Sequence, residues 1–467
     1  MALSRIWSAF VIISILIAAF KFAFQPGQQK IFSQLVTGKN TDTISTRFVD
    51  STSLPENVSG QLQYEKTAVW DKERVMKEGT GYRVFRLLPS NGIIDTCKSA
   101  VEICIGLIGI MALFMGFMSI AEKAGGIRFL SRVIGPFFSK IFPDIPKGHP
   151  SMGHMVMNFS ANLLGLDNAA TPFGIKAMES LQELNPDKDR ATNAQVMFLC
   201  LHAAGLTLIP VAIIAARAAV KPPSANPTDI FVPCMIATFV ATMAAMFIVS
   251  IKQKINIFQP VILAWVGGIS AIIAALVWYL TSLTPDRLQQ VSGVLGNGIL
   301  LMILLLIVLG GVYKKINIFE AFIEGAKGGF ETAVRIIPYL VGLLVAISLL
   351  RNSGVFELII DGMKNLFAAL GADTRFVDGL PTALIKPLSG SGARGMMIDT
   401  MNAYGADSFA GRLACVLQGS SDTTFYVIAV YFGAVAVKNT RYTVGAMLLA
   451  DLVGIITSIF LAYMFFG

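Results

Sequence analysis

Nine long runs of apolar residues restrict the fold of this chain more than any other feature. They lie at 6–24, 93–120, 193–219, 228–250, 257–282, 291–312, 327–350, 410–436 and 441–466. A helix needs about 20 apolar residues to cross a hydrocarbon core of roughly 30 Å. Hydrophobic residues make up 54% of the chain and charged residues 14%, whereas soluble proteins carry roughly 25% charged residues. The sequence therefore predicts an all-α, multi-pass membrane protein with the lipid bilayer as its main partner.

Two further stretches, at about 150–178 and 380–403, are apolar in part but are interrupted by polar and helix-breaking residues. The first contains Gly165, Pro172 and Gly174 among amide, hydroxyl and carboxylate side chains. Such a segment cannot face lipid, because its freed backbone groups would have no hydrogen-bond partners. We expect each stretch to form a re-entrant hairpin of two half-helices. Broken helices of this kind bind solutes in transporters.

The two halves of the chain have the same order of predicted elements. Each half runs from a span to an amphipathic helix, at 127–142 or 354–370, then to a hairpin and two more spans. Lys98, Glu102, Ser119 and Gly125 match Lys327, Glu331, Ser348 and Gly354 at a constant offset of 229, which is 327 minus 98. Five predicted crossings separate the starts of the copies, so the second copy is inverted. This arrangement predicts inverted repeats whose hairpins meet near the middle of the membrane.

The predicted organisation has five parts. They are an N-terminal membrane anchor at 1–24, a small extracytoplasmic domain at 25–92, a first repeat at 93–250, connecting spanning helices at 251–325 and a second repeat at 326–467. Lys21 lies near the end of the first run, and no small-residue cleavage site is present there, so we prefer an uncleaved anchor to a signal peptide. Lys and Arg concentrate in alternate short loops, which indicates a cytoplasmic N-terminus.

Polar residues of the hairpins and of one interrupted span are the candidate substrate-binding residues. They are Asn158, Ser160, Asn162, Asp167, Asn168 and Thr171 in the first hairpin, Ser389, Ser391 and Arg394 in the second, and Gln418, Ser420, Ser421, Asp422 and Thr423 in the span at 410–436. Asp167 and Asp422 are also candidates for coupling to H⁺ or Na⁺, because a carboxylate at membrane depth is costly unless paired or protonated. The alternative is that these side chains cap half-helices and satisfy one another.

Other chemistry is not indicated. The five cysteines are scattered, and the three histidines lack carboxylate or thiol partners at ligand spacing, so we expect no metal site. We find no nucleophile–base pair and no phosphate-binding loop, and therefore expect neither an enzyme nor a cofactor. The net charge of +8 is not gathered in a basic tail, which argues against nucleic-acid binding.

Two long motifs carry a resemblance to a known family. Residues of about 93–220, with the motif from Asn162 to Gly174, resemble the spore maturation A proteins. Residues of about 325–467, with the motifs 387–395 and 418–426, resemble the spore maturation B proteins. The chain is therefore similar to an A–B fusion. The resemblance implies the Gate, or nucleoside-recognition, domain that is shared with concentrative nucleoside transporters and with the membrane domain of ferrous iron transporter B.

The resemblance also implies a bacterial inner-membrane protein with a nucleoside-transporter-like fold and, by analogy, a homo-oligomer. The family name comes from a role in spore core dehydration and heat resistance, and the family also occurs in bacteria that do not sporulate. Our first hypothesis is an ion-coupled, elevator-type secondary transporter of a small polar solute, such as an anion or a nucleoside-like molecule. The alternative is a non-transporting envelope or spore-maturation scaffold that recruits partners through 25–92.

Overall fold

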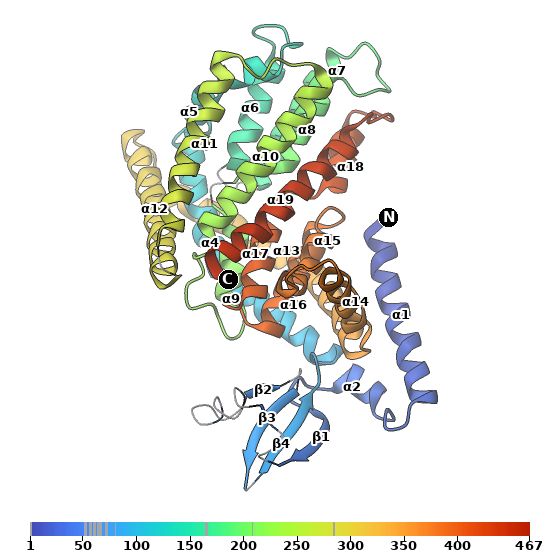
Figure 1. The fold of residues 1–467 in the computed structure, drawn as a ribbon. Coiled ribbons are helices and arrows are strands. Elements are labelled where there is room, and N and C mark those ends of the chain that lie inside the picture. The colour runs from blue at the N-terminus through green and yellow to red at the C-terminus, as the bar shows by residue number, and fades with distance from the viewer. Residues whose placement is uncertain are drawn as a thin grey trace. The chain divides into compact units, whose positions relative to one another are not determined.

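The computed structural model describes residues 2–467 except 51–53, 56–57, 59–61, 63–67, 71–72, 80, 164–166, 208 and 284 (Figure 1). The chain divides into two compact units. Unit 1 comprises residues 1–101 and 341–370, and unit 2 comprises residues 102–340 and 371–467. Helices α4 (Ile93–Lys123) and α13 (Ile318–Asn352) run from one unit into the other.

Unit 1 contains a small antiparallel sheet together with helices. Its elements are α1 (Ala2–Phe24), α2 (Ile31–Thr37), β1 (Thr43–Val49), β2 (Ala68–Trp70), β3 (Glu73–Glu78), β4 (Gly81–Leu87), the first residues of α4, the end of α13, and α14 (Val355–Ala369). The strand order is β1-β4-β3-β2. Val75 and Val84 pair across β3 and β4 and are fully buried against Leu54 and Val58. The segment 25–92, predicted as a small domain, thus contains one helix and four strands among its described residues.

Helix α1 is attached to the end of α13 by two long-range hydrogen bonds. The indole nitrogen of Trp7 donates to the carbonyl of Gly342 at 2.8 Å, and Nζ of Lys21 donates to the carbonyl of Ser353 at 2.6 Å. The last carbonyls of a helix have no partner within the helix, and a lysine is favoured beside them. Lys21 therefore helps to terminate α13 before Gly354 turns the chain, with φ +81°, into α14.

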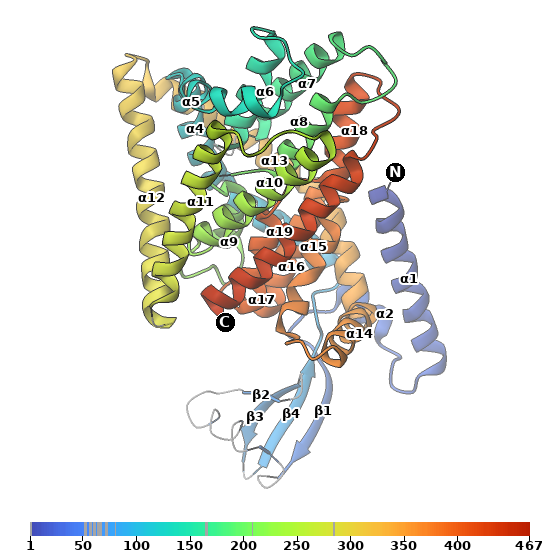
Figure 2. The same cartoon turned by 45° about the horizontal axis from the view of Figure 1, so that its top comes forward.

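Unit 2 is entirely helical among its described residues. Besides most of α4 and α13 it contains α5 (Gly126–Ile141), α6 (Pro150–Leu163), α7 (Asp167–Glu183), α8 (Asn193–Ala204), α9 (Val211–Ala219), α10 (Phe231–Gln253), α11 (Pro260–Thr281), α12 (Pro285–Tyr313), the short 3₁₀ helix η2 (Arg375–Gly379), α15 (Leu380–Ile385), α16 (Gly390–Tyr404), α17 (Phe409–Gly419), α18 (Thr424–Ala434) and α19 (Thr443–Phe466). Helices α6 and α7 pack against each other, and α10 packs along α19 (Figure 2).

Eight helical segments of the described residues are long and apolar enough to cross a membrane. They are Trp7–Phe24, Ile93–Lys123, Phe231–Gln253, Pro260–Tyr279, Val294–Tyr313, Ile318–Asn352, Phe409–Ala434 and Thr443–Phe466. The ninth expected crossing, 193–219, is divided into α8 and α9, which have 12 and 9 residues. At 1.5 Å per residue neither spans a hydrocarbon core alone. The all-α polytopic membrane class is confirmed, and the protein contacts the lipid bilayer.

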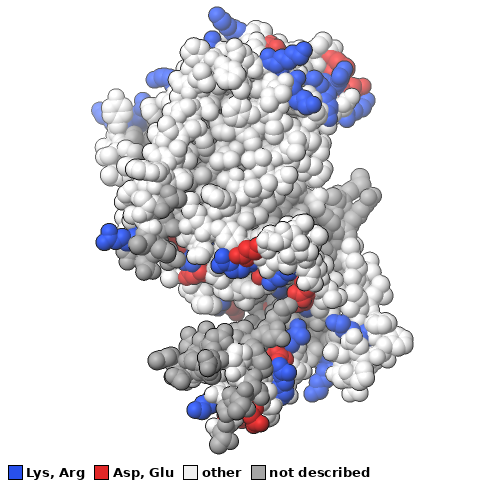
Figure 3. All heavy atoms as spheres, in the orientation of Figure 1, with Lys and Arg blue, Asp and Glu red and all other residues white. Residues whose placement is uncertain are grey.

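Charged side chains are unevenly placed on the surface of unit 2. Figure 3 shows Lys and Arg beside the loops from α7 to α8 and from α18 to α19, whereas the face over α10, α11 and α19 has few charges. The two loops are joined, because the backbone amides of Lys438 and Asn439 both donate to the carbonyl of Asp189 at 2.9 Å. The apolar face between the charged ends suits contact with lipid.

Both predicted hairpins consist of two helices with an interruption between them. In the first, α6 and α7 flank residues 164–166, which lie outside the described residues. In the second, α15 and α16 flank a turn at 386–389. The predicted amphipathic helices are α5 and α14. Dipping of the hairpins into the membrane and the inverted relation of the two halves stay predictions.

Candidate functional site: a polar cavity between broken helices

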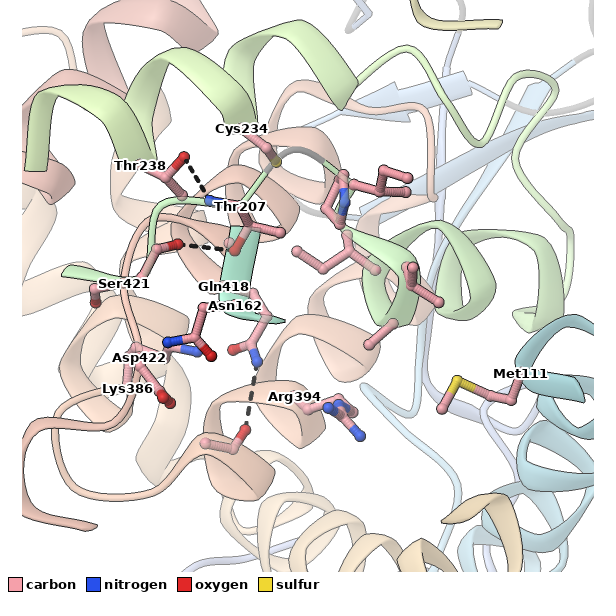
Figure 4. Close-up of a pocket in the computed structure, with 18 of the residues that line it drawn as sticks. Met111, Asn162, Thr207, Cys234, Thr238, Lys386, Arg394, Gln418, Ser421 and Asp422 are labelled. Carbon is pink, nitrogen blue, oxygen red and sulfur yellow. Dashed lines mark hydrogen bonds between the residues drawn. The ribbon is translucent and has the colours of Figure 1, made fainter. Parts of the chain in front are cut away.

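A cavity of about 230 Å³ lies inside unit 2, where several helix ends converge (Figure 4). Its lining comes from α4, α6, the α8–α9 break, α10, α13, the α15–α16 turn and the α17–α18 break. The polar lining residues include Asn162, Thr207, Thr238, Lys386, Arg394, Gln418, Ser421 and Asp422. Both predicted hairpins thus contribute to one cavity, through Asn162 from the first and Arg394 from the second.

The cavity exists because two helices break at the same place. Gly205 follows α8 with φ +61° and Pro210 precedes α9, while four residues separate Gly419, the end of α17, from the start of α18. The amide of Asp422 donates to the carbonyl of Ala203 at 2.7 Å, so one break supplies a partner for the other. A side chain on Gly205 would contact the Asp422 amide at 3.4 Å and would need a left-handed conformation. Glycine at 205 therefore permits this close approach.

A buried histidine connects the first hairpin to the α17–α18 break. His202, at the end of α8, is 4% exposed. Its Nδ1 lies 2.8 Å from Nδ2 of Asn162 and 3.0 Å from Oδ1 of Asn158. Its Nε2 lies 3.9 Å from Oδ2 of Asp422. A polar path therefore runs from α6 through α8 to the carboxylate in the cavity.

Two cationic side chains and one carboxylate face the cavity. Lys386 follows α15 and is 8% exposed, Arg394 lies in the second turn of α16, and Asp422 lies in the α17–α18 break (Figure 4). Charged groups at membrane depth are costly and mark functional sites by default. Lys386 and Arg394 in the lining give the cavity the means to bind a carboxylate or phosphate.

Gln418 leaves a hydrogen-bond acceptor open in the cavity wall. Its side chain is 7% exposed, and its Oε1 has no partner among the described residues. Its Nε2 donates to the carbonyl of Gly390 at 3.4 Å, which is a long contact. A buried polar atom without a partner costs about 1–3 kcal/mol. A solute that offers an N–H or O–H group at this point would remove that cost.

Several predicted site residues instead make hydrogen bonds that hold the helices. The hydroxyl of Ser389 accepts from the amide of Gly392 at 3.0 Å and caps α16, and the hydroxyl of Ser391 lies 3.3 Å from it. The amide of Asn158 donates to the carbonyl of Ala170 at 2.7 Å, and Ser420 donates to the carbonyl of Leu417 at 2.9 Å. The contacts of these residues agree with the alternative stated above, in which polar side chains cap the half-helices and satisfy one another.

The remaining predicted residues differ in their surroundings. Thr423 packs against Gly390, where an added Cβ would lie 2.6 Å from the threonine hydroxyl. Ser160 is fully buried, and its hydroxyl has no partner in the described part of the chain. Thr171 hydrogen-bonds the Tyr431 hydroxyl. The side chains of Asp167 and Asn168 lie outside the described residues.

Sequence reasoning did not select Lys386 or Asp451 as site residues. Asp451 lies within α19, is 4% exposed, and accepts a hydrogen bond from the Thr424 hydroxyl at 2.5 Å. An aspartate in the middle of a 24-residue apolar helix is a signal that could have identified it, because ionisable residues in spanning helices are rare. Lys386 lies inside the polar run that was already singled out as the second hairpin.

A second buried polar cluster lies apart from the cavity lining. We call it the Arg217 network: Arg217, Ser224, Asp229, Asp407 and Arg412. Arg217 is fully buried; its Nη2 lies 2.8 Å from Asp229 and 3.0 Å from Asp407, and its Nη1 donates to the carbonyl of Ala406 at 2.8 Å. Arg412 bonds Asp229 at 2.8 Å, and Ser224 donates to Asp407 at 2.6 Å. The network joins α9, the start of α10 and the loop between α16 and α17.

The fold and cavity define a polytopic helical membrane protein with an internal polar site. The family described as "Gate: Nucleoside recognition" matches residues 104–220 and 333–438. Spore maturation protein B of Bacillus subtilis (strain 168) is 50% identical over 161 residues, which are 34% of this chain and 89% of that protein. Spore maturation protein A of the same organism is 41% identical over 159 residues, 34% of this chain and 80% of that protein. No solved structure matches this chain.

The chain therefore belongs to the Gate nucleoside-recognition family and is homologous to spore maturation proteins A and B. Each relative is largely covered, yet each accounts for about a third of this chain. Such coverage is expected for a chain in which an A-type and a B-type protein are fused, as the sequence motifs indicated. A membrane transporter-like or spore maturation role fits these relatives.

Proposed function

We propose that this protein is a secondary transporter of a small anionic solute in the bacterial inner membrane, with its N-terminus in the cytoplasm. The carrying observation is the convergence of Lys386, Arg394, Gln418 and Asp422 on one internal cavity that is formed by broken helices. Lys386 and Arg394 bind the anionic group. Gln418 accepts a hydrogen bond from a donor on the solute, and Asn162 contributes a further amide to the cavity lining.

The size of the cavity limits the solute. About 230 Å³ holds about eight water molecules at roughly 30 Å³ each. A short carboxylic acid or inorganic phosphate fits this volume, whereas a dinucleotide does not. A nucleoside is close in size to the cavity of about 230 Å³, so it stays among the solutes to be tested beside small anions.

Movement of the two hairpins as one unit would expose the cavity on alternate sides, as in an elevator mechanism. This part of the proposal is supported by the contribution of both predicted hairpins to the lining. Coupling to an ion is assigned to the carboxylates around the cavity, of which Asp422 faces it directly. Asp167 stays a candidate, and so does a homo-oligomeric assembly.

Uptake by purified protein in lipid vesicles tests the proposal. Phosphate, succinate and uridine serve as solutes after a thermal-shift screen, since a ligand of the folded state raises its melting temperature. We expect Arg394→Gln to lower uptake at least tenfold, because a charge-assisted bond is lost. The matched control is Arg375→Gln, since the Arg375 side chain is 56% exposed at the start of the 3₁₀ helix η2. If the Arg394→Gln protein and the Asp422→Asn protein both take up solute as fast as the wild type, the proposal is wrong.

A scaffold function is the second candidate, and one observation favours it. Phe48 lies on the edge strand β1 with 69% of its surface exposed. An exposed edge strand can pair with another chain. If recruitment is the function, Phe48→Ser loses a partner in pull-down while Arg394→Gln keeps it. If transport is the function, Arg394→Gln lowers uptake and Phe48→Ser leaves uptake unchanged.

A further inference from the structure

Helix α5 begins where a spanning segment ends. The candidate span Ile93–Lys123, helix α4, is followed by Gly125, whose φ of +84° turns the chain into α5 at Gly126. The 16 residues of α5 extend over roughly 24 Å at 1.5 Å per residue, which is too short to cross a hydrocarbon core. An amphipathic helix in this place suits the membrane interface.

Three faces can be distinguished on α5. The first packs into the core of unit 2 and consists of Ile134, Phe138 and Ile141. The second is apolar and open, with 65% of Phe129 and 39% of Val133 exposed. The third carries Arg128 and Arg132, which are exposed and lie four residues apart, so that they project from the same side of the helix. Such a helix can place one face in protein, one among acyl chains and one among lipid headgroups.

The two arginines are not used to hold the fold together. Neither Arg128 nor Arg132 makes an ion pair with a residue of the described chain. Helix α5 contains no acidic residue, and neither do α6 and α11, which pack against it. Two exposed guanidiniums without an internal counterion attract an anion from outside, and a guanidinium binds phosphate through two parallel hydrogen bonds.

Helix α14 shows that these cations are particular to α5. At the constant offset between the two halves, Arg128 and Arg132 correspond to Glu357 and Asp361, since 357 minus 128 and 361 minus 132 both equal 229. The open apolar face is kept, because Leu358 on α14 is 66% exposed. Amphipathic packing therefore does not require arginine at these positions. The reversal of charge points to a negatively charged partner for α5 alone.

An anionic phospholipid matches this surface in both charge and polarity. Its phosphate complements Arg128 and Arg132, and its acyl chains offer an apolar partner for Phe129 beside them. Basic segments next to a spanning helix are attracted to anionic lipids. A free phosphate ion would leave the exposed ring of Phe129 without a partner.

Helix α5 is also coupled to the first hairpin. The ring of Phe138 meets the ring of Phe159 on α6 at a centroid distance of 5.2 Å, and both side chains belong to one buried core. Phe159 precedes Asn162, which lines the cavity, by about one helical turn. A ligand that holds α5 therefore also restrains α6.

We propose that α5 binds the headgroup of an anionic phospholipid through Arg128 and Arg132, with Phe129 against the acyl chains, and that the bound lipid restrains the first hairpin. The inference goes beyond the proposed function and does not depend on it. It concerns the outer surface of unit 2, whereas the solute is assigned to the internal cavity.

Native mass spectrometry of the purified full chain, titrated with phosphatidylglycerol or with phosphatidylcholine, tests the binding. One basic residue beside an anionic lipid surface changes the affinity by about fivefold. We therefore expect Arg128→Gln/Arg132→Gln to weaken phosphatidylglycerol binding by about tenfold or more and to leave phosphatidylcholine binding unchanged. Arg128→Lys/Arg132→Lys keeps both charges and should retain most of the binding. The matched control is Arg190→Gln/Lys314→Gln, which removes two exposed charges from loops and should bind as the wild type does.

The proposed lipid site is wrong if the wild type binds the two lipids equally, or if the control pair loses as much binding as Arg128→Gln/Arg132→Gln. Inorganic phosphate at the concentration of the lipid should not displace phosphatidylglycerol, because it has no apolar part to place against Phe129. Displacement would assign the surface to a free anion and overturn the proposal.

Hydrogen exchange of residues 150–163, which form α6, tests the restraint on the hairpin. Phosphatidylglycerol should slow exchange of this segment in the wild type but not in Arg128→Gln/Arg132→Gln. If lipid binds and exchange stays the same, the restraint is refuted. Neither measurement needs transport, so a protein that shows both effects but moves no anion contradicts the transporter proposal alone.

Discussion

The Arg217 network and the cavity are both buried and polar, yet their hydrogen bonding differs. Arg217 makes six hydrogen-bond contacts through its two terminal nitrogens, to Asp229, Asp407, Ser224, the Ala406 and Asn226 carbonyls and the Cys415 sulfur, while its Nε has no partner among the described residues. In the cavity, Gln418 keeps an open acceptor, and Lys386 and Arg394 belong to the lining.

The difference separates a structural role from a binding role. A buried ion network whose charges are paired holds one conformation, and removal of one member leaves other charges uncompensated. A cavity with an open acceptor keeps bonding capacity for a guest. We therefore expect changes in the network to lower stability, and changes at the cavity to lower binding with little loss of stability.

The largest expected effect is in the network. Arg217→Gln should lower the free energy of unfolding by about 3–5 kcal/mol, because Asp229 and Asp407 stay buried without their cation. Chemical unfolding in detergent measures the change, and Arg375→Gln, at an exposed side chain of η2, is the control. If the free energy of unfolding falls by less than about 1 kcal/mol, the network stabilises the protein no more than an exposed ion pair does.

The next effect concerns packing between the first hairpin and α18. A Cβ on Gly174 would lie 2.5 Å from Cε1 of Tyr431 and 2.8 Å from Nδ2 of Asn158. Gly174→Ala should therefore cost about 1–3 kcal/mol through overpacking. Gly153 on α6 has open space around it, so Gly153→Ala should be neutral or stabilising, since alanine favours helix. Equal melting temperatures for the two variants would contradict the packing seen here.

A smaller effect should appear in acid. Burial acts to raise the pKa of Asp407, but the Ser224 hydroxyl, the Ala225 amide and the Arg217 and Arg412 guanidiniums hold the pKa below its ordinary value. A lowered pKa means that ionised Asp407 stabilises the fold above the unfolded pKa of about 3.9, and that this stability is lost as pH falls through the folded pKa.

The comparison is between wild type and Asp407→Asn in melting experiments from pH 6 to pH 3. The wild type should be the more stable protein at pH 6, and the gap should narrow below about pH 4, where the unfolded carboxyl takes up its proton. A gap that is constant over the whole range would show that the ionisation of Asp407 adds nothing to the network.

The smallest effect on stability should come from the cavity. Gln418→Leu removes an acceptor that has no partner among the described residues, so unfolding should change by less than about 1 kcal/mol. Uptake of the transported anion should nevertheless fall at least tenfold. A strongly destabilised Gln418→Leu protein would place Gln418 with the structural residues and weaken the contrast with the Arg217 network.

Local pattern predicted the helices of this protein well. Apolar runs indicated the spanning helices, and the polar run from Gln418 to Thr423 indicated where α17 and α18 are separated. Prediction failed where a side chain's partner is remote in sequence. Ser389 caps its own helix, whereas Lys386, a few residues earlier, lines the cavity, and no local pattern distinguishes the two roles.

The sequence by itself determined the class of the protein, its helices and their interruptions, because apolar length and the conformations of glycine and proline are local properties. Only the tertiary structure decided that the two breaks meet at Ala203 and Asp422, and that Arg217 is enclosed by acids from other segments. The physical reason is that a buried polar group must find its partner in space, and that partner can lie some 200 residues away along the chain.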